Sequence, residues 1–154
     1  MAQYIQNDVT NEDHVKSLIA TIIKEFGQLD MAVNNAGISS EVVSIDASNS
    51  DNYSAMVNTN LVDLYYCMKH QIIQMLKQKQ GAIVNVASVA GLNGIPWAAT
   101  YASTKHGVVG LTKSAAILIM RSKVFVLTRQ PLALSELILL TNNLMAMMKI
   151  IMKK

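Results

Sequence analysis

Apolar side chains recur at three- and four-residue intervals near the start of the chain, which is the spacing of one face of an α-helix. The positions that share this face are Val15, Leu18, Ile19, Ile22, Ile23 and Phe26. Thr10 and Asp13 are expected to form a variant of the capping box at the start of this helix. Gly27 follows the last apolar position and is expected to end it. The pattern therefore predicts one amphipathic helix.

Three shorter segments lack this spacing and are predicted to be strands. Residues 3–7 form the first, which ends at Asp8 and Val9. Residues 29–34 and 82–87 are mostly apolar without alternation, as expected of strands that are buried on both faces of a parallel sheet.

Two further helices complete the predicted fold. A polar loop at residues 38–48 precedes a long helix, which Ser48 or Ser50 caps and which reaches about Lys77. A loop with glycine and proline separates the last strand from a helix at residues 98–118. Strands that alternate with helices predict an α/β fold, in which helices cover both faces of a parallel sheet.

The composition favours a single folded domain in a reducing compartment. The chain has 154 residues, of which 51% are hydrophobic and 15% charged, unlike a disordered sequence. The net charge of +3 is modest, and its basic residues form no stripe with aromatics, so nucleic-acid binding has little support. The single cysteine, Cys67, cannot form an internal disulfide and is interpreted as a small buried apolar residue. The first eight residues show no signal-peptide pattern, so we expect a cytoplasmic protein.

A tyrosine and a lysine four residues apart are the most informative chemical feature of the sequence. Tyr101 and Lys105 lie in the helix predicted at residues 98–118, where positions i and i+4 share one face. A nearby positive charge favours the ionised form of a phenol. The pair is therefore a candidate acid and base for moving a proton on or off an alcohol or carbonyl oxygen. Ser88, at the end of the preceding strand, could hydrogen-bond the same oxygen.

This spacing alone also describes a half-buried tyrosine beside a solvated lysine, but two further motifs accompany it. Residues 34–37 read Asn-Asn-Ala-Gly after an apolar run, and residues 81–91 read GAIVNVASVAG. In their order and spacing these elements resemble the short-chain dehydrogenase/reductase family, from about Asp8 to about Ile117. The resemblance implies a partial Rossmann-like, doubly wound parallel sheet with flanking helices. It also implies an NAD(P)-dependent oxidoreductase.

The resemblance implies a role for each matching residue in proton transfer. Tyr101 would be the acid and base, and Lys105 its electrostatic partner, which also hydrogen-bonds the cofactor ribose. Ser88 would polarise the substrate oxygen, and Asn60 would hold a water in a proton relay. An asparagine inside a helix can also simply hydrogen-bond neighbouring backbone, so that interpretation of Asn60 stays open.

The same resemblance implies where the cofactor, NAD or NADP, would lie. Asp8 and Val9 match the pair that contacts adenine, although Asp8 by itself would be typical of a turn. Asn35, Ala36 and Gly37 match the turn beside the adenosine ribose. The substrate would be a small-molecule alcohol or ketone. The resemblance further implies a homo-oligomer, and it suggests neither a nucleic-acid, a membrane nor a metal partner.

Other polar and aromatic residues are interpreted as structural. His106 follows Lys105 but points about 100° away from it around a helix, so it is interpreted as a surface histidine. His14 and His70 are interpreted in the same way. Tyr65 and Tyr66 are expected in the core or in a subunit interface.

Two departures from the family pattern limit the functional prediction. The seven glycines form no glycine-rich turn between an opening strand and a helix, where a dinucleotide pyrophosphate binds. After Ile117 the resemblance ends, and the remainder contains no glycine. We therefore divide the chain into a partial Rossmann domain at residues 1–118 and a non-family tail at residues 119–154.

The genetic code suggests an origin for this tail. Synonymous codons for residues 123–128, such as AAG GTA TTC GTG TTA ACG, contain GGT ATT CGT GTT AAC in a shifted frame. That frame encodes Gly-Ile-Arg-Val-Asn, which matches the strand expected in the family. Our hypothesis is that a change of reading frame near Ile117 or Leu118 replaced the family C-terminus. The alternative is a selected membrane-surface helix, in which Lys149, Lys153 and Lys154 lie near its end.

These departures leave three functions open. The first is an NAD(P)-dependent oxidoreductase. The second is an inactive truncated remnant that can only oligomerise with relatives. The third, which only the tail supports, is a membrane-associated chain.

The frame hypothesis predicts the DNA sequence of the gene. Reading the adjacent frame from the codons near Ile117 should yield the Ile-Arg-Val-Asn strand and then a Pro-Gly segment. Sequencing the gene and its flanks measures this. A stop codon in that frame before the Pro-Gly equivalent would show that the tail has another origin.

Overall fold

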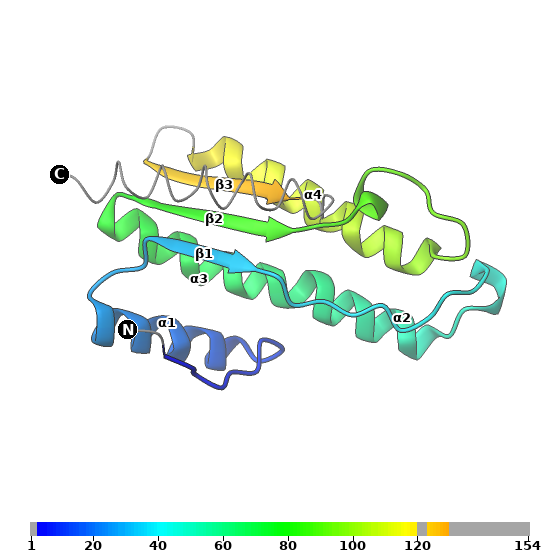
Figure 1. Cartoon of the computed structure of the whole chain (residues 1–154), viewed down its shortest axis with the longest axis horizontal. Coiled ribbons are helices and arrows are strands. Elements are labelled where there is room, and N and C mark those ends of the chain that lie inside the picture. Colours follow the sequence, from blue (N-terminus) through cyan, green and yellow to red (C-terminus); the bar gives the residue numbers. More distant parts are fainter. Residues whose placement is uncertain (1–2, 120–122, 130–154) are drawn as a thin grey trace.

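Three parallel strands form the sheet of the protein. The computed structural model describes residues 3–119 and 123–129. The strands β1 (Met31–Asn34), β2 (Gly81–Val86) and β3 (Val124–Arg129) lie in the order β1-β2-β3 (Figure 1). Parallel neighbours require crossover connections, and here helices supply both. The predicted α/β fold, a partial Rossmann-like parallel sheet with flanking helices, is confirmed.

The helices follow the predicted order. They are α1 (Glu12–Phe26), a 3-10 turn η1 (Ile45–Ala47), α2 (Ser50–Val57), a π-helical turn η2 (Asn58–Val62), α3 (Asp63–Gln78), a 3-10 turn η3 (Val89–Gly91) and α4 (Ala99–Ile119). Gly27 ends α1 with φ +83°, as predicted, because its N–H bonds the carbonyl of Ile23 in a conformation that favours glycine.

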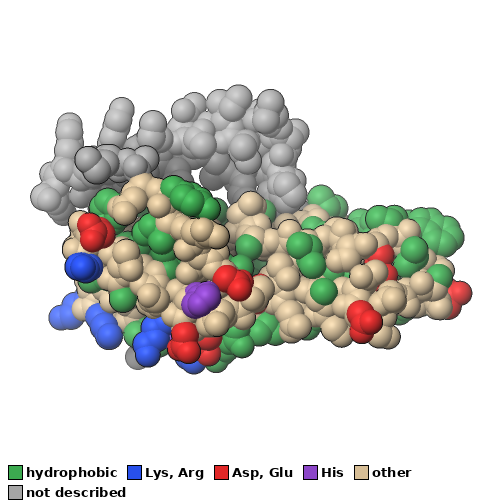
Figure 2. Space-filling model, turned by 90° about the horizontal axis from the view of Figure 1, so that it is seen from below, with side chains coloured by type: hydrophobic (Ala, Val, Ile, Leu, Met, Phe, Trp, Pro, Cys, Tyr) green, Lys and Arg blue, Asp and Glu red, His purple; other side chains and the backbone are tan. Residues whose placement is uncertain are grey.

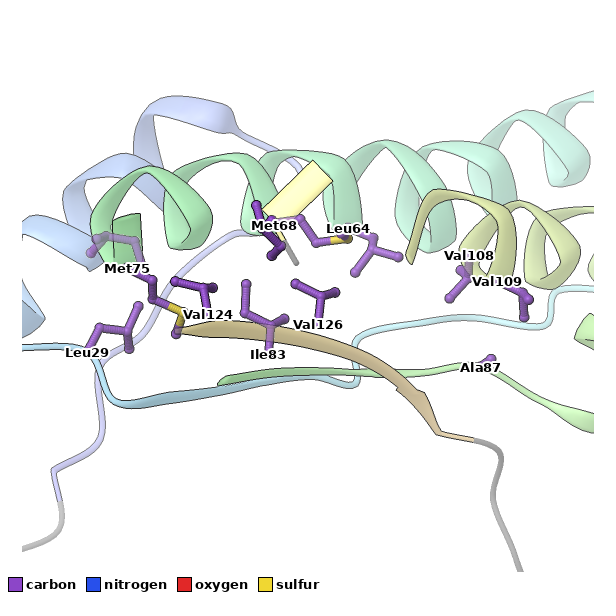
Figure 3. Close-up of a cluster of buried hydrophobic side chains, with 12 residues drawn as sticks. Leu29, Leu64, Met68, Met75, Ile83, Ala87, Val108, Val109, Val124 and Val126 are labelled. Carbon is purple, nitrogen blue, oxygen red and sulfur yellow. The ribbon is translucent and has the colours of Figure 1, made fainter. Parts of the chain in front are cut away.

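The core lies between the sheet and the helices on one of its faces. Side chains of α3 and α4 point toward the strands in Figure 3, where they meet Ile83, Val124 and Val126. Ile83 is completely buried, whereas Phe125 and Leu127, on the opposite face of the sheet, are 60% and 56% exposed. The prediction of strands buried on both faces is therefore wrong for the described residues, because their helices form a layer on one face only.

Residues 3–7 are not a strand, contrary to the prediction. A strand needs a neighbour with which to share backbone hydrogen bonds. β1 pairs only with β2, and no described strand lies beside residues 3–7. The strand expected after the last helix is present as β3, although its residues are not Ile-Arg-Val-Asn.

The caps of α1 and α2 are asparagines that directly precede the helices, rather than the predicted residues. Asn11 accepts hydrogen bonds from the second and third backbone N–H groups of α1, and Asn49 does the same for α2. The predicted hydroxyls are engaged elsewhere: Thr10 donates to Asp8 at 2.7 Å, and Ser48 donates to a backbone carbonyl at 2.8 Å. Both helices thus begin one residue away from the expected cap.

A buried ladder of polar side chains joins β1, β2, α3 and α4. Asn34 Nδ2 donates to Gln71 Oε1 at 3.0 Å and to Asn85 Oδ1 at 2.8 Å, and Gln71 Nε2 donates back to Asn34 Oδ1 at 2.8 Å. Asn85 Nδ2 donates to Thr112 Oγ1 at 2.9 Å, and that hydroxyl donates to the carbonyl of Val108. Because a satisfied buried network tolerates little displacement, this amide ladder fixes the two strand ends relative to both helices.

The surface has no extended basic stripe on the face shown in Figure 2, where the Lys and Arg side chains gather toward one end of the molecule. No helix in the described parts of the chain is both long and apolar enough to cross a membrane. The membrane-surface alternative for the tail rests mainly on residues 130–154, which lie outside the described residues.

Removing one amide from the ladder should destabilise the fold. We expect Asn85→Leu to lower the free energy of unfolding by about 1–3 kcal/mol, because it leaves the half-buried Asn34 and the buried Thr112 with fewer partners. Urea unfolding monitored by circular dichroism measures this. The matched control is Asn93→Leu, since Asn93 is exposed and makes only a 3.5 Å contact. Equal effects of the two substitutions would contradict a stabilising role for the ladder.

Candidate active site

The predicted long helix is interrupted by the π-helical turn η2, and this turn carries Asn60 into the interior. Asn60 is 2% exposed. Its Nδ2 donates to the carbonyl of Ile38 at 2.9 Å, and its Oδ1 accepts from the N–H of Ile38 at 2.7 Å. Nδ2 also donates to Thr104 Oγ1 at 3.0 Å. Asn60 thus ties the loop after β1 to α4, and π-turns of this kind are frequent at functional sites.

Lys105 is buried beside Tyr101 on α4. Only 5% of the residue is exposed to solvent. Its Nζ donates a hydrogen bond to the carbonyl of Val86 at 3.3 Å. Nζ also lies 5.7 Å from the centre of the Tyr101 ring. Burial lowers the pKa of Lys105 below its ordinary value. Tyr101 and Lys105, predicted to share one helix face, are thus adjacent in the structure. The alternative interpretation, a half-buried tyrosine beside a solvated lysine, does not hold, because Lys105 is buried.

Two glycines allow the chain to approach this pair closely. A Cβ at Gly37 would lie 3.1 Å from Asn60 Oδ1 and 3.3 Å from Lys105 Nζ. A Cβ at Gly91 would lie 2.7 Å from the backbone carbonyl of Lys105, which is too close for any side chain. The loops after β1 and β2 therefore both meet α4 at the level of Lys105.

Ser88 begins the second of these loops. Its Oγ accepts the N–H of Ala90 at 3.2 Å and so caps η3, two residues after the carbonyl that binds Lys105. Tyr101 is half-buried in the first turn of α4. The fold thus gathers the four predicted proton-transfer residues at the carboxyl end of the sheet, where ligands bind in open α/β folds.

The residues predicted to contact the cofactor fall into two groups. Asn35, Ala36 and Gly37 are exposed at the carboxyl end of β1, next to Lys105. Asp8 and Val9 lie in the turn shortly before α1, and Asp8 lines a hollow of about 440 Å³. The hydroxyl and the N–H of Thr10 both bond Asp8 and lower the pKa of its carboxyl, which is therefore an ionised acceptor at neutral pH.

Asp63 is a buried acid that the sequence did not single out. It is 2% exposed at the start of α3, and its Oδ2 has no hydrogen-bond partner among the described residues. Burial raises the pKa of Asp63 to about 6, and the carboxylate of Asp8 adds to the effect.

Burial also raises the pKa of the Cys67 thiol to about 11, with a contribution from Asp63, so the thiol is protonated at neutral pH. Cys67 is half-buried, in keeping with a packing role.

Thr104 is a site residue that spacing alone did not reveal. It is 1% exposed, accepts from Asn60, and donates to the carbonyl of Tyr101 at 2.8 Å. Its position next to Lys105 could have suggested burial, but a threonine on a helix more often bonds only its own backbone. Thr104 therefore connects Asn60 to the turn that carries Tyr101.

The three histidines lie outside this constellation. His14 and His106 are exposed, as predicted. His70 is half-buried, and its Nε2 lies 2.9 Å from Glu12 Oε1, so its prediction as a surface residue is wrong. Glu12, at the start of α1, thus contacts the imidazole on α3. No group of three metal-ligating side chains occurs within the described residues.

The described residues could bind the ribose and the amino group of a nucleotide, but they provide no glycine-rich turn for its pyrophosphate. Lys105 has an ammonium with one modest backbone bond, next to an exposed turn, and could donate further hydrogen bonds to ribose hydroxyls. The ionised Asp8 could accept from an amino group. No described residues form a glycine-rich turn between a strand and a helix, so this part of the chain supplies no pyrophosphate site of that type.

Comparison with known proteins agrees with these motifs. A sequence model described as short chain dehydrogenase matches residues 1–135. The chain is 40% identical over 115 residues to a 3beta-hydroxysteroid dehydrogenase of Mediterraneibacter gnavus, covering 75% of this chain and 41% of the relative. It is 42% identical over 112 residues to a 3-oxoacyl-[acyl-carrier-protein] reductase of Staphylococcus aureus, covering 73% of this chain and 45% of the relative.

Solved structures show the same similarity. ElxO with NADP bound superposes with a TM-score of 0.80 at 41% identity, over 82% of this chain and 51% of that one. NAD+-bound xylitol dehydrogenase superposes with a TM-score of 0.79 at 30% identity, over 81% of this chain and 48% of that one. The chain spans less than half the length of the curated relatives described above.

The raised pKa of Asp63 makes a prediction about stability and pH. Unfolded, this carboxyl titrates near its ordinary value of 3.8, but in the folded protein it titrates near 6. The folded state therefore binds more protons in this range, and stability is lost as the pH rises toward and past 6. We expect Asp63→Asn to raise the free energy of unfolding at pH ~7.5 by about 1–3 kcal/mol and to have little effect near pH ~4.

Thermal or urea unfolding at the two pH values measures this effect. Asp46→Asn is the matched control, because Asp46 is exposed and the same charge is removed. A change in stability that is equal at both pH values would show that ionisation of Asp63 is not its cause.

Proposed function

The chain belongs to the short-chain dehydrogenase family, and on that premise we propose that it is an NAD- or NADP-dependent oxidoreductase acting on an alcohol or a ketone. The observation that carries the proposal is the buried ammonium of Lys105, fixed by the carbonyl of Val86 and placed 5.7 Å from the Tyr101 ring. A structural lysine would be expected in solvent. Its burial next to a half-buried phenol is what proton transfer at that phenol requires.

In the proposed reaction Tyr101 moves the proton. During reduction its hydroxyl donates a proton to the carbonyl oxygen of the substrate, and during oxidation the phenolate takes a proton from the alcohol. The ammonium of Lys105 stabilises negative charge on the tyrosine oxygen. Ser88 donates a hydrogen bond to the substrate oxygen, for which its Oγ has a free proton while it accepts from Ala90.

Asn60 positions the loop beside this centre. Its amide oxygen accepts a hydrogen bond from Ile38, and its amide nitrogen donates to Ile38 and Thr104. These bonds support a positioning role for Asn60. One lone pair of its Oδ1 is still available to a water, so the relay implied by the family is compatible with this arrangement.

The cofactor would lie along the carboxyl end of the sheet. Its nicotinamide supplies or accepts a hydride when bound. We assign Asn35, Ala36 and Gly37 to contacts beside the ribose, together with Lys105. Asp8 and Val9 are assigned to the adenine. The similar structures that carry NADP and NAD+ support either nucleotide.

The substrate and location are proposed on broader grounds. Apolar side chains between Ser88 and Tyr101 are exposed beside the site, among them Leu92 at 51% and Trp97 at 64%. They support a substrate with an apolar portion, as do the names of two relatives, a 3beta-hydroxysteroid dehydrogenase and a 3-oxoacyl-[acyl-carrier-protein] reductase. We propose a small-molecule substrate, no nucleic-acid or membrane partner, and a cytoplasmic location, which the unpaired Cys67 supports.

A second candidate is a non-catalytic chain that associates with copies of itself or with relatives. An apolar groove of about 400 Å³ lies between η2, α3 and α4, lined by Leu61, Val62, Tyr65, Gly107, Gly110, Leu111 and Ser114. Tyr65 is 47% exposed there, which favours the interface interpretation over the core. Either candidate is compatible with a homo-oligomer, and light scattering tests it: a monomer at high concentration contradicts assembly.

Substitution of the tyrosine distinguishes the two candidates. We expect the purified chain to oxidise NAD(P)H in the presence of a ketone, and Tyr101→Phe to lower kcat by at least about 100-fold, because the proton donor is lost. Absorbance or fluorescence of the reduced nicotinamide measures turnover. The circular dichroism spectrum should be unchanged, since the Tyr101 hydroxyl makes no hydrogen bond to a described residue.

The control is Tyr66→Phe, which removes the same hydroxyl from a half-buried tyrosine on α3. This variant should retain parental turnover. If the parent chain shows no turnover with either nucleotide over a panel of alcohols and ketones, the non-catalytic candidate replaces the enzyme.

A further inference from the structure

Glu41 connects three separate segments at the substrate end of the site. It lies in the loop between β1 and α2. One carboxylate oxygen, Oε1, accepts the hydroxyl of Thr100 at 3.3 Å. The other, Oε2, accepts the N–H of Asn49 at 3.1 Å and Nδ2 of Asn52 at 3.3 Å. These donors lower the pKa of Glu41, with the N–H of Asn49 contributing most, so the side chain is ionised at neutral pH.

The contact with Thr100 matters because that residue directly precedes Tyr101. Both lie in the first turn of α4, where backbone N–H groups have no partners within the helix. Contacts from outside the helix therefore decide where this turn lies. A weaker contact with α2 lies nearby, because Ser103 Oγ, which donates to the carbonyl of Thr100 at 2.7 Å, is 3.4 Å from the hydroxyl of Tyr53.

The next turn of α4 has its own attachments. Thr104 accepts from Asn60, and Lys105 donates to the carbonyl of Val86. Two sets of contacts therefore hold the start of α4, one to η2 and to the carbonyl of Val86 and one to the loop of Glu41. Glu41 is the only charged group bonded to this turn among the described residues.

We propose that Glu41 is a positioning residue for Tyr101: through Thr100 it fixes the first turn of α4 so that the phenol meets the substrate oxygen. This inference rests on the proposed oxidoreductase function. Misplacement of a reacting group lowers the rate of the chemical step more than it weakens binding. Loss of the Glu41 contact should therefore lower kcat and leave KM nearly unchanged.

The test compares Glu41→Gln, Thr100→Val and the double variant with the parent chain. Glutamine retains the shape of Glu41 but replaces one acceptor oxygen by a donor, and valine removes the Thr100 hydroxyl at similar size. We expect each single variant to lower kcat by about 5- to 20-fold with KM changed less than about 2-fold. The double variant should be no slower than Glu41→Gln alone, since both changes remove one contact. Glu25→Gln is the control, because Glu25 is exposed at the other end of the molecule on α1.

Amide hydrogen exchange supplies a readout that does not depend on activity. In Glu41→Gln, exchange should accelerate at least about 10-fold in residues 41–52 and 99–103, and remain parental in α1 and β2. If Glu41→Gln does not fold, Thr100→Val alone must show the accelerated exchange at residues 99–103.

The outcomes separate this inference from the proposed function. Parental exchange at residues 99–103 in both single variants overturns the inference, whatever the activity. Additive losses of kcat in the double variant overturn the route through Thr100. If the parent chain has no turnover, the proposed function fails, and the exchange result alone supports or overturns the positioning of the Tyr101 turn by Glu41.

Discussion

The amide ladder of Asn34, Gln71, Asn85 and Thr112 is the constraint on which the rest of the structure depends. It joins β1 and β2 to α3 and α4 through three buried side chains and the half-buried Asn34, each of which has a partner. A buried amide without a partner costs free energy, so the ladder strongly favours one alignment of these elements. Asn85 directly precedes Val86, whose carbonyl receives Lys105. The alignment set by the ladder is thereby transmitted to the site.

The buried ammonium of Lys105 is the point where fold and chemistry meet. Burial opposes its charge and lowers its pKa, so the structure must surround it with compensating dipoles. The carbonyl of Val86 is one such dipole, and the face of the Tyr101 ring is another. Gly37 and Gly91 contribute by leaving room for the loops to approach. A lysine that only solubilised the surface would not need this arrangement, and a proton-transfer pair does.

The sequence predicts the fold where the spacing of apolar residues is regular. It does not predict which of several neighbouring polar residues forms a given hydrogen bond. The order of helices and parallel strands follows from the apolar spacing. The helix caps do not follow from this spacing. Asn11 and Asn49 cap α1 and α2, whereas the neighbouring hydroxyl of Thr10 bonds Asp8 instead. Residues 3–7 include Tyr4 and Ile5, which favour a strand, but a strand exists only with a neighbour.

By itself the sequence determined the family, the helical pair of Tyr101 and Lys105, and the polar motifs at the ends of two strands. Each of these depends on residues close together in the chain, whose spacing has a direct geometric meaning. Only the tertiary structure decided that Lys105 is buried, that Asn60 occupies a π-helical turn and bonds Ile38 and Thr104, and that Asp63 is a buried acid. Those properties depend on desolvation and on partners 19 or more residues away in sequence, such as Val86 for Lys105 and Ile38 for Asn60, which local patterns do not encode.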